Sequence, residues 1–447
     1  MNEILLERDG RSREIDARLP TGRCSTALSG GTRVSDDPQP RTCPPMKLSF
    51  PIRVLSVSVA LLANAHATVA FKKIVLTDEY LADGINAGDF NRDGRRDVVA
   101  GPYWYEGPDI STRHAFYPAE PQDVAAAPSN SLFSFVADFN GDGWDDILVL
   151  GRVLHHQAFW YENPRGAGGF WKKHFAIHRV FGEAPMFVDM DGDGRAEVIS
   201  FWQDQWGWWA PAPGEPAAPW GFHPVTEKGK YREYYHGSGV GDINGDGRMD
   251  LVLNEGWWEQ PAEKGATWKH HPVKFSQGRG GAQILVYDID GDGDSDVVSA
   301  IDAHGWGLSW FEQVKRNKEQ IEFVEHRMMG DRSEETKFGV AFSQPHALCL
   351  ADIDGDGLMD VITGKRRWAH GPKGDVEPMG TPVNYWFRLQ RDGRGGAWFT
   401  PVLIDDASAL GTQVEAIDVT GDGRPDVLTA SKLGAFVFVP EAAASSR

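Results

Sequence analysis

Cysteine is scarce in this chain: three occur in 447 residues, and two of them, Cys24 and Cys43, lie before residue 46. A disulfide framework is therefore not predicted, and stability must come from a packed core and from bound metal. The sequence also lacks a nucleophile elbow, a phosphate-binding loop and the CxxC and HExxH patterns. The sequence therefore gives no support to covalent serine hydrolysis or to structural zinc sites.

Positive charge and long apolar runs are also limited. The chain has 45 Lys and Arg against 64 Asp and Glu, which gives a formal net charge of −19. Such a charge argues against a nucleic acid as partner, because phosphates repel an acidic surface. The apolar stretch at residues 54–62 is too short to cross a bilayer, so no membrane span is predicted.

The amino terminus has the pattern of a secretory signal. Residues 46–67 combine Lys47 and Arg53, the apolar stretch and an A-x-A cleavage site that ends at Ala67. Residues 1–45 are polar and patternless, and we expect them to be a non-native or disordered leader. The predicted organisation is therefore a leader at 1–45, a signal peptide at 46–67 and one domain at 68–447. The predicted location is secreted or periplasmic.

A short acidic loop of the form D-x-[DNT]-x-D-G-x-x-[DE] recurs seven times. The steps between successive copies are 49, 51, 53, 46, 64 and 66 residues. Repetition at this spacing indicates a repeat architecture. Oxygen ligands at alternate positions around a glycine are how a loop wraps Ca²⁺, so up to seven calcium ions are predicted.

The expected calcium ligands are side chains at loop positions 1, 3, 5 and 9 and the backbone carbonyl at position 7. By loop these are Asp89, Asn91, Asp93, Arg95, Asp97; Asp138, Asn140, Asp142, Trp144, Asp146; Asp189, Asp191, Asp193, Arg195, Glu197; Asp242, Asn244, Asp246, Arg248, Asp250; Asp288, Asp290, Asp292, Asp294, Asp296; Asp352, Asp354, Asp356, Leu358, Asp360; and Asp418, Thr420, Asp422, Arg424, Asp426. Thr420 makes the last site the weakest. An EF-hand is excluded, because its loop needs a Glu at position 12 and none of the seven copies has one.

The sequence around the loops is typical of strands. Short β-branched runs follow each loop, then an aromatic pair such as Trp160-Tyr161, then a further strand such as the one starting at Trp171. Four strands in each of seven repeats predict an all-β, seven-bladed β-propeller. The strand from Phe71 has no partners before it, and the strand ending near Pro440 has none after it. We therefore expect the first strand to join the last blade and close the ring. Most of the 17 Trp should fill the space between blades.

The loop pattern resembles the FG-GAP or VCBS repeat family, whose members form β-propellers of the integrin α-subunit type. The resemblance covers the chain after residue 70. It implies the propeller fold and the calcium loops, but the family is functionally broad.

In a propeller of this kind the acidic loops lie on one face, and a ligand site is expected on the opposite face around the central channel. The residues six positions before each loop should ring its entrance: Asp83, Leu132, Glu183, His236, Ala282, His346 and Thr412. The turns after the second strand of each unit should add Tyr103, Arg152, Gln203, Glu255, Asp302, His304, Lys365, Arg366 and Lys432. Together they combine the His, Lys, Arg and carboxylate groups that acid–base chemistry needs.

Four stretches are similar to the propeller domain of the aldos-2-ulose dehydratases, which remove water from keto-sugars. They start at His304, Gln344, Gly364 and Gly411. The resemblance implies a β-elimination by a carbon–oxygen lyase. It implies His346 or His236 as the base, with Lys365 and Arg366 as the electrophiles. It further implies Tyr103 as the proton donor, with His304 at the same site, and a second divalent metal held by His236, His346 and a carboxylate.

Other interpretations stay open. The domain could be a non-catalytic calcium-stabilised propeller that binds a glycan or a protein, or a polysaccharide lyase that acts on uronic acids. His236 and His346 could be structural histidines, and Lys365-Arg366 a solvated turn. For His155-His156 and His270-His271 we expect surface roles. In each functional case the predicted partner is a carbohydrate or another small molecule in the central channel.

Overall fold

The computed structural model describes residues 69–125, 128–151, 157–229, 231, 233–317 and 320–441. The predicted leader and signal peptide lie outside the described residues, as do Arg152, His155 and His156. Within the described part the regular secondary structure is almost entirely β-strand. It has one short 3₁₀-helix, Arg332–Glu334, and one α-helix of four residues, α1 (Glu335–Phe338). None of the helices found there is long and apolar enough to span a membrane.

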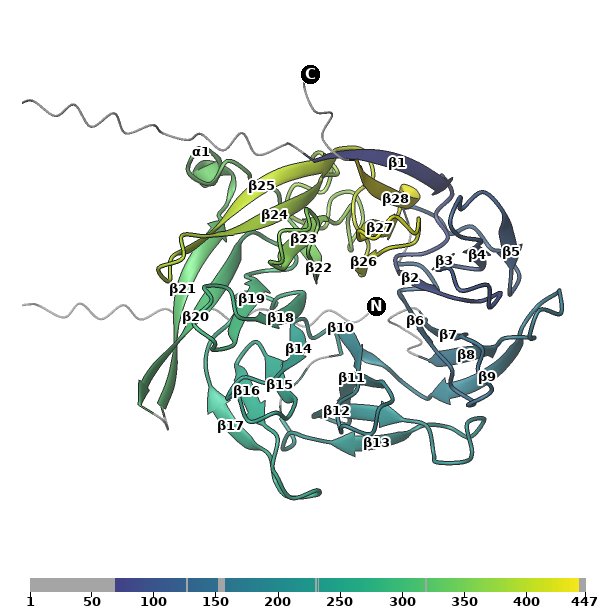
Figure 1. The fold of residues 1–447 in the computed structure, drawn as a ribbon, viewed down its shortest axis with the longest axis horizontal. Coiled ribbons are helices and arrows are strands. Elements are labelled where there is room, and N and C mark those ends of the chain that lie inside the picture. Colours follow the sequence, from purple (N-terminus) through teal and green to yellow (C-terminus); the bar gives the residue numbers. More distant parts are fainter. Residues whose placement is uncertain are drawn as a thin grey trace, which may run out of the picture. The chain divides into compact units, whose positions relative to one another are not determined.

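Five sheets contain four strands each. They are β2(Ile85–Gly88), β3(Asp97–Ala100), β4(Tyr103–Tyr105), β5(Arg113–Ala115); β6(Phe133–Ala137), β7(Asp146–Leu150), β8(Ala158–Glu162), β9(Lys172–Ile177); β10(Phe181–Val188), β11(Glu197–Trp202), β12(Gln205–Ala210), β13(Gly221–Pro224); β22(Pro345–Ala351), β23(Asp360–Lys365), β24(Asn384–Arg391), β25(Ala397–Asp405); and β26(Val414–Ile417), β27(Asp426–Ser431), β28(Gly434–Glu441) with β1(Ala70–Thr77). Figure 1 shows the sheets of the unit His66–Arg447 set around a common centre, with strands such as β2, β6, β22 and β26 innermost. This is a β-propeller arrangement.

The sixth sheet has eight strands. It consists of β14(Ser238–Gly241), β15(Asp250–Leu253), β16(Gly256–Glu259), β17(Lys269–Pro272), β18(Gln283–Tyr287), β19(Asp296–Ala300), β20(Leu308–Asn317) and β21(Gln320–Met329). Two four-stranded halves are joined here by a parallel pairing of β14 with β18 at Ser238–Gln283 and Gly239–Ile284. The strands approach this closely because Gly239 has no side chain: a Cβ there would lie 2.0 Å from the carbonyl oxygen of Ile284. The structure therefore has five separate four-stranded sheets and one eight-stranded sheet where the sequence predicts seven blades.

The first strand pairs with the last. β1 runs antiparallel to β28 from Ala70–Glu441 to Thr77–Ala435, so the sheet order is β1-β28-β27-β26. On the inner side, β2 contacts both β6 and β26. The two ends of the described chain thus belong to one sheet.

A stacked Trp–His pair recurs on the outer strands. The ring of His271 lies flat on Trp257, with centroids 3.9 Å apart and planes 4° from parallel, and its Nε2 lies 2.7 Å from a carboxylate oxygen of Glu259. The same trio occurs as Trp104, His114, Glu106; Trp160, His174, Glu162; and Trp310, His326, Glu312. His270 stacks in the same way on Trp258. These tryptophans are buried between the sheets, as the sequence predicts.

Glu415 is an acidic group in the central channel. It lines a cavity of about 350 Å³ with Phe133, Phe187 and Leu348, and accepts a hydrogen bond from Gln413 at 2.8 Å. Burial raises the pKa of Glu415 from 4.5 to about 7, against the lowering effect of Gln413.

Glu415→Gln should therefore remove a pH dependence of stability. Because the pKa is raised in the folded state, the stabilising contribution is complete below pH 4.5 and is lost as the pH rises through about 7. The loss should amount to about 2–3 kcal/mol in wild type. Urea denaturation at pH 5 and pH 8 measures it, with exposed Glu120→Gln as the control. Equal pH slopes in wild type and Glu415→Gln would contradict this assignment.

Candidate functional site

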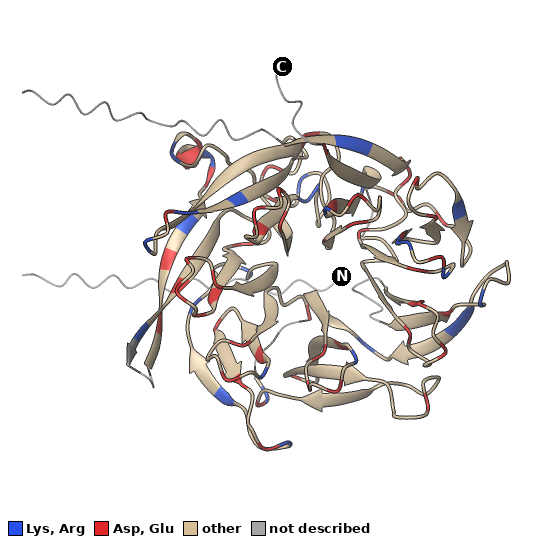
Figure 2. Cartoon of the chain, viewed as in Figure 1, with Lys and Arg blue, Asp and Glu red and all other residues tan. Residues whose placement is uncertain are grey.

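The seven acidic loops share one backbone geometry. In the second loop Asp138 accepts hydrogen bonds from the N–H groups of Asp142 at 3.0 Å and Gly143 at 2.7 Å. Asp146, at position 9, is fully buried and accepts from the N–H groups of Phe139 and Asn163 at 3.1 and 2.8 Å. The first carboxylate thus folds the loop tip, and the last holds the loop on its sheet. Figure 2 shows acidic residues recurring in the loops of the unit.

Three of these loops gather carboxylates closely enough to share an ion. The oxygens of Asp189, Asp191, Asp193 and Glu197 lie within 4.8 Å of one another, and the same holds for Asp288, Asp290, Asp296 and for Asp352, Asp354, Asp356. Several loops also have a basic neighbour, such as Arg165 at 2.9 Å from Asp142 and Arg388 at 3.1 Å from Asp356. The loops therefore offer oxygen ligands, and basic side chains already balance part of their negative charge.

A second cluster lies at the centre of the sheets, and its four residues are buried. Glu183 comes from β10, His236 precedes β14, His304 lies between β19 and β20, and His346 belongs to β22. Strand irregularities place two of these residues. The pairing of β10 shifts between Phe181 and Met186, and that of β22 between Pro345 and Leu348. Such irregularities re-aim side chains, and here they turn Glu183 and His346 to the centre.

The Nε2 atoms of the three histidines converge with one oxygen of Glu183. The Nε2 atom of His236 lies 2.9 Å from that of His304 and 3.2 Å from that of His346. The carboxylate oxygen Oε2 of Glu183 lies 3.3 Å from His236 Nε2 and 3.2 Å from His346 Nε2. All four atoms are within 4.8 Å of one another.

These distances fit a metal ion. Metal–nitrogen bonds of about 2.0–2.1 Å place neighbouring ligand atoms about 3.0–3.4 Å apart in tetrahedral or octahedral geometry. Hydrogen bonds alone satisfy the group poorly, because a neutral imidazole carries one ring hydrogen and the buried Nδ1 atoms of His236 and His346 have no partner among the described residues. Three imidazoles and one carboxylate suit Zn²⁺, Fe²⁺ or a similar divalent cation.

Arg366 borders the cluster. Its NH1 atom lies 3.2 Å from Glu183 Oε2 and 2.7 Å from His346 Nε2, while its NH2 and Nε atoms are buried without a hydrogen-bond partner among the described residues. Burial and the positive charge of Arg366 hold the pKa of His346 well below its usual value. Burial acts to raise the pKa of Glu183, but contacts with His236 and His346 outweigh it, and the pKa lies well below the usual range. The cluster thus combines an ionised carboxylate with neutral imidazole, as metal binding requires.

Asp375 connects the cluster to the cavity beside it. Its Oδ1 atom lies 3.3 Å from Nδ1 of His304 and 2.7 Å from Nδ1 of His370, and Oδ2 accepts from the N–H groups of Ala369 and His370, both at 2.9 Å. Burial acts to raise the pKa of Asp375, but hydrogen bonds from His304 and His370 outweigh it, so the pKa lies well below its usual range. Burial also lowers the pKa of His304 below its usual value. His304 is therefore neutral at neutral pH.

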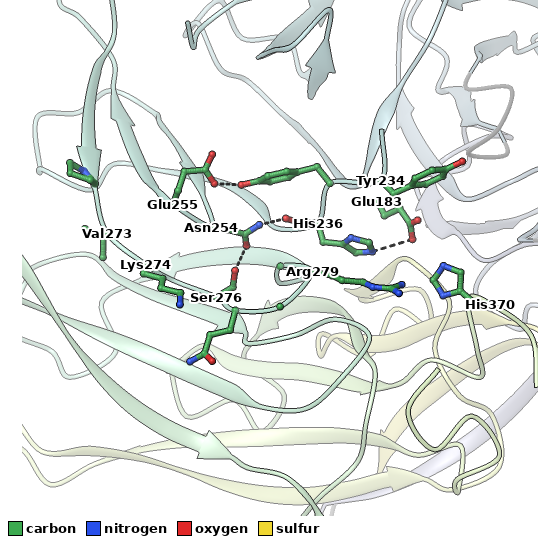
Figure 3. Close-up of a pocket in the computed structure, with 15 residues that line it drawn as sticks. Glu183, Tyr234, His236, Asn254, Glu255, Val273, Lys274, Ser276, Arg279 and His370 are labelled. Carbon is green, nitrogen blue, oxygen red and sulfur yellow. Dashed lines mark hydrogen bonds and ion pairs between the residues drawn. The ribbon is translucent and has the colours of Figure 1, made fainter. Parts of the chain in front are cut away.

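The cluster lies beside a cavity of about 1080 Å³, which has room for a small sugar. Figure 3 shows His236 directed at Glu183, with Arg279 and His370 facing the same space. Tyr235 donates a hydrogen bond to Glu255 on the cavity wall. The exposed side chain of Tyr234 also lines the cavity. The cavity thus presents basic groups, carboxylates and aromatic rings together.

The structure brings together four of the six residues predicted for catalysis: His236, His304, His346 and Arg366. It places Lys365 elsewhere: its Nζ atom donates to Ser343 Oγ at 2.6 Å, and burial lowers its pKa to about 8. Arg366 follows directly after the end of β23, and its NH1 atom contacts Glu183 and His346. Tyr103, on β4, packs against Tyr105 and Arg113 and is not among the residues that line the cavity.

Sequence reasoning placed Glu183 at the entrance but gave it no role, and it missed Asp375 and His370. Both missed residues lie in the long segment between β23 and β24, residues 366–383. The sequence signal for this long segment was the 66-residue step between the last two acidic loops, because the extra residues of a longer repeat lie in its loops.

Comparisons with known proteins identify the repeat. The FG-GAP-like repeat family matches residues 138–200 and 242–299. No curated protein matches the sequence. The resemblance to the aldos-2-ulose dehydratases stays a prediction.

Solved structures similar to this chain include a lectin from Agrocybe aegerita that recognises terminal N-acetylglucosamine, at 15% identity and a TM-score of 0.43, covering 82% of this chain and 87% of that one. The V. cholerae biofilm matrix protein Bap1 is 10% identical with a TM-score of 0.38, covering 85% and 88%. The exotype rhamnogalacturonan lyase YesX is 12% identical with a TM-score of 0.41, covering 83% and 72%. Likeness at this level does not transfer function. The chain thus carries FG-GAP-like repeats at residues 138–200 and 242–299, within a propeller arrangement of sheets.

Proposed function

We propose that the protein is a metal-dependent carbon–oxygen lyase that acts on a sugar in the cavity beside the histidine cluster. One observation carries the proposal: three imidazole Nε2 atoms and a carboxylate oxygen converge in a buried cluster next to a cavity of about 1080 Å³. A buried set of this kind costs folding free energy unless a ligand satisfies it. We expect His236, His304, His346 and Glu183 to hold one divalent cation.

The proposed reaction is the loss of water from a keto-sugar. A base removes the proton on the carbon next to the carbonyl, a carbon–carbon double bond forms, and the hydroxyl on the next carbon leaves with a proton as water. A bound divalent cation would supply Lewis-acid polarisation of a substrate oxygen. Arg366, which contacts Glu183 and His346 through NH1, would place a positive charge beside the cation site. If His236 and His346 are metal ligands, the base must be another group.

Metal analysis combined with an elimination assay tests this function. The protein would be stripped with a strong chelator, reloaded with Zn²⁺, Mn²⁺ or Fe²⁺, and incubated with keto-hexoses and with uronate-containing glycans. The expected result is about one tightly bound transition metal per chain and an ultraviolet-absorbing unsaturated product that depends on it. Binding of metal without formation of any product would contradict the proposed lyase activity, but the proposed metal site would stand.

A non-catalytic sugar-binding propeller is the second candidate, and one contact favours it. Arg366 NH1 lies 2.7 Å from His346 Nε2, the atom that a metal would need. An arginine that stays bonded there would neutralise the cluster without metal. In that case calorimetry should detect sugar binding that is unaffected by chelation.

We also propose that the seven acidic loops bind Ca²⁺, supported by the spacing of their oxygen ligands along the sequence. A chelator specific for Ca²⁺ should then lower the melting temperature markedly, since a site at 100 times its Kd stabilises by about 2.7 kcal/mol. Asp354→Ala should remove only the part of this stabilisation that comes from one of the seven sites. Calorimetry with and without added Ca²⁺ measures both effects. An unchanged melting temperature in excess chelator would contradict calcium binding.

Two points of architecture belong with this proposal. We propose that the two halves of the eight-stranded sheet count as two blades, because their link is limited to two residue pairs of β14 and β18. With the five separate sheets this gives seven blades. We further propose that β1 closes the ring through its pairing with β28, and that the protein is secreted or periplasmic.

A further inference from the structure

The three histidines of the cluster differ at their second ring nitrogen. Within the described residues the Nδ1 atoms of His236 and His346 are buried without a partner, whereas Nδ1 of His304 faces Asp375 at 3.3 Å. The side chains of His304 and Asp375 are 6% and 1% exposed, so water competes little for this contact. Of the three imidazoles, His304 is the one whose orientation is fixed by a side-chain contact at Nδ1, on the side of the ring away from the cluster.

The environment of Asp375 determines which ring nitrogen of His304, Nδ1 or Nε2, carries the hydrogen. Oδ2 is occupied by the N–H groups of Ala369 and His370, so Oδ1 is left to face the two imidazoles. An ionised carboxylate can only accept, so Nδ1 of His304 must carry the ring hydrogen. In a neutral imidazole the lone pair then lies on Nε2, the atom that points into the cluster.

We propose that Asp375 is a positioning residue that fixes His304 in the Nδ1–H tautomer and thereby aims its Nε2 lone pair at the cation site. The inference rests on the proposed metal site and deepens it. Carboxylates behind metal-bound histidines contribute about 10–100-fold to metal affinity. Because Asp375 also bonds His370 on the cavity wall, it links the cluster to the place where substrate would bind.

Asp375→Asn separates this role from a structural one. The amide oxygen can still accept the backbone N–H groups of Ala369 and His370, so the turn is kept. The amide N–H groups then face His304, where they favour a lone pair on Nδ1 and the hydrogen on Nε2. We expect about a 10–100-fold loss of Zn²⁺ affinity in competition with a chromophoric chelator, and a nearly unchanged melting temperature of the metal-free protein.

The ring nitrogens of ¹⁵N-histidine-labelled, metal-free protein provide the second readout. Wild type should show His304 with a protonated Nδ1 and an unprotonated Nε2, and Asp375→Asn should reverse this. His370→Ala is the matched control: it removes the other partner of Asp375 and should leave the His304 tautomer and the Zn²⁺ affinity unchanged.

The outcomes are distinguishable. If Asp375→Asn keeps both the wild-type tautomer and the wild-type Zn²⁺ affinity, Asp375 does not position His304. If wild type binds no Zn²⁺, Mn²⁺ or Fe²⁺, the proposed function fails, while the NMR spectra of the metal-free proteins still decide the role of Asp375. An equal loss in Asp375→Asn and His370→Ala would show a general disturbance of the 366–383 segment and overturn the inference.

Discussion

Replacing His346 with alanine is expected to abolish transition-metal binding and, with it, formation of the unsaturated product. His346 is completely buried and contributes one of four converging ligand atoms. The loss of a ligand should exceed the roughly 10–100-fold effect of a residue behind a ligand, so we expect at least about 100-fold weaker Zn²⁺ binding. Chelator competition measures the affinity, and ultraviolet absorbance in the presence of a keto-sugar measures the product. Calcium binding should persist, because His346 belongs to none of the acidic loops.

His326→Ala is the matched control for this variant. His326 lies on β21, stacks on Trp310 and contacts Glu312 at 2.7 Å, away from the cluster. The His326→Ala variant should bind the metal and form the product at wild-type levels. If His346→Ala also keeps both, the cluster is not the site. If it loses metal but keeps product, the reaction does not depend on the cluster.

Deleting β1, residues 70–77, is expected to have the largest effect on stability. The strand makes seven paired positions with β28 and covers an edge that includes Val437 and Phe438, at 0% and 1% exposed. At about 0.5–1.5 kcal/mol for each backbone hydrogen bond, the loss should be about 4–10 kcal/mol. That is comparable to the whole stability of a typical domain. Urea denaturation and size-exclusion chromatography should show unfolding or aggregation through the exposed edge of β28.

Removal of residues 1–67 is the control for that deletion. It takes away the predicted leader and signal peptide and leaves β1 in place, so the free energy of unfolding should not change. Wild-type stability in both truncations would contradict the role proposed for β1 in closing the ring.

The repeats could be predicted from the sequence because their physics is local. A glycine at position 6 of each loop, an acid at position 9 that bonds the backbone at position 2, and an aromatic pair after the loop all act within one unit. Four strands per unit follow from these signals. The joining of two units into one eight-stranded sheet does not follow from these local signals, because it depends on how closely β14 and β18 approach at Gly239.

The candidate site was only partly predictable because its parts come from different sheets. The ring of positions before the acidic loops led to Glu183, His236 and His346, since the repeat itself places those positions around the channel. Only the tertiary structure decided that strand irregularities turn Glu183 and His346 to one point, and that Arg366 rather than Lys365 faces it. The sequence by itself thus determined the repeating units, which local interactions specify. The convergence of four ligand atoms and the support of His304 by Asp375 were decided by packing between units, which no local pattern records.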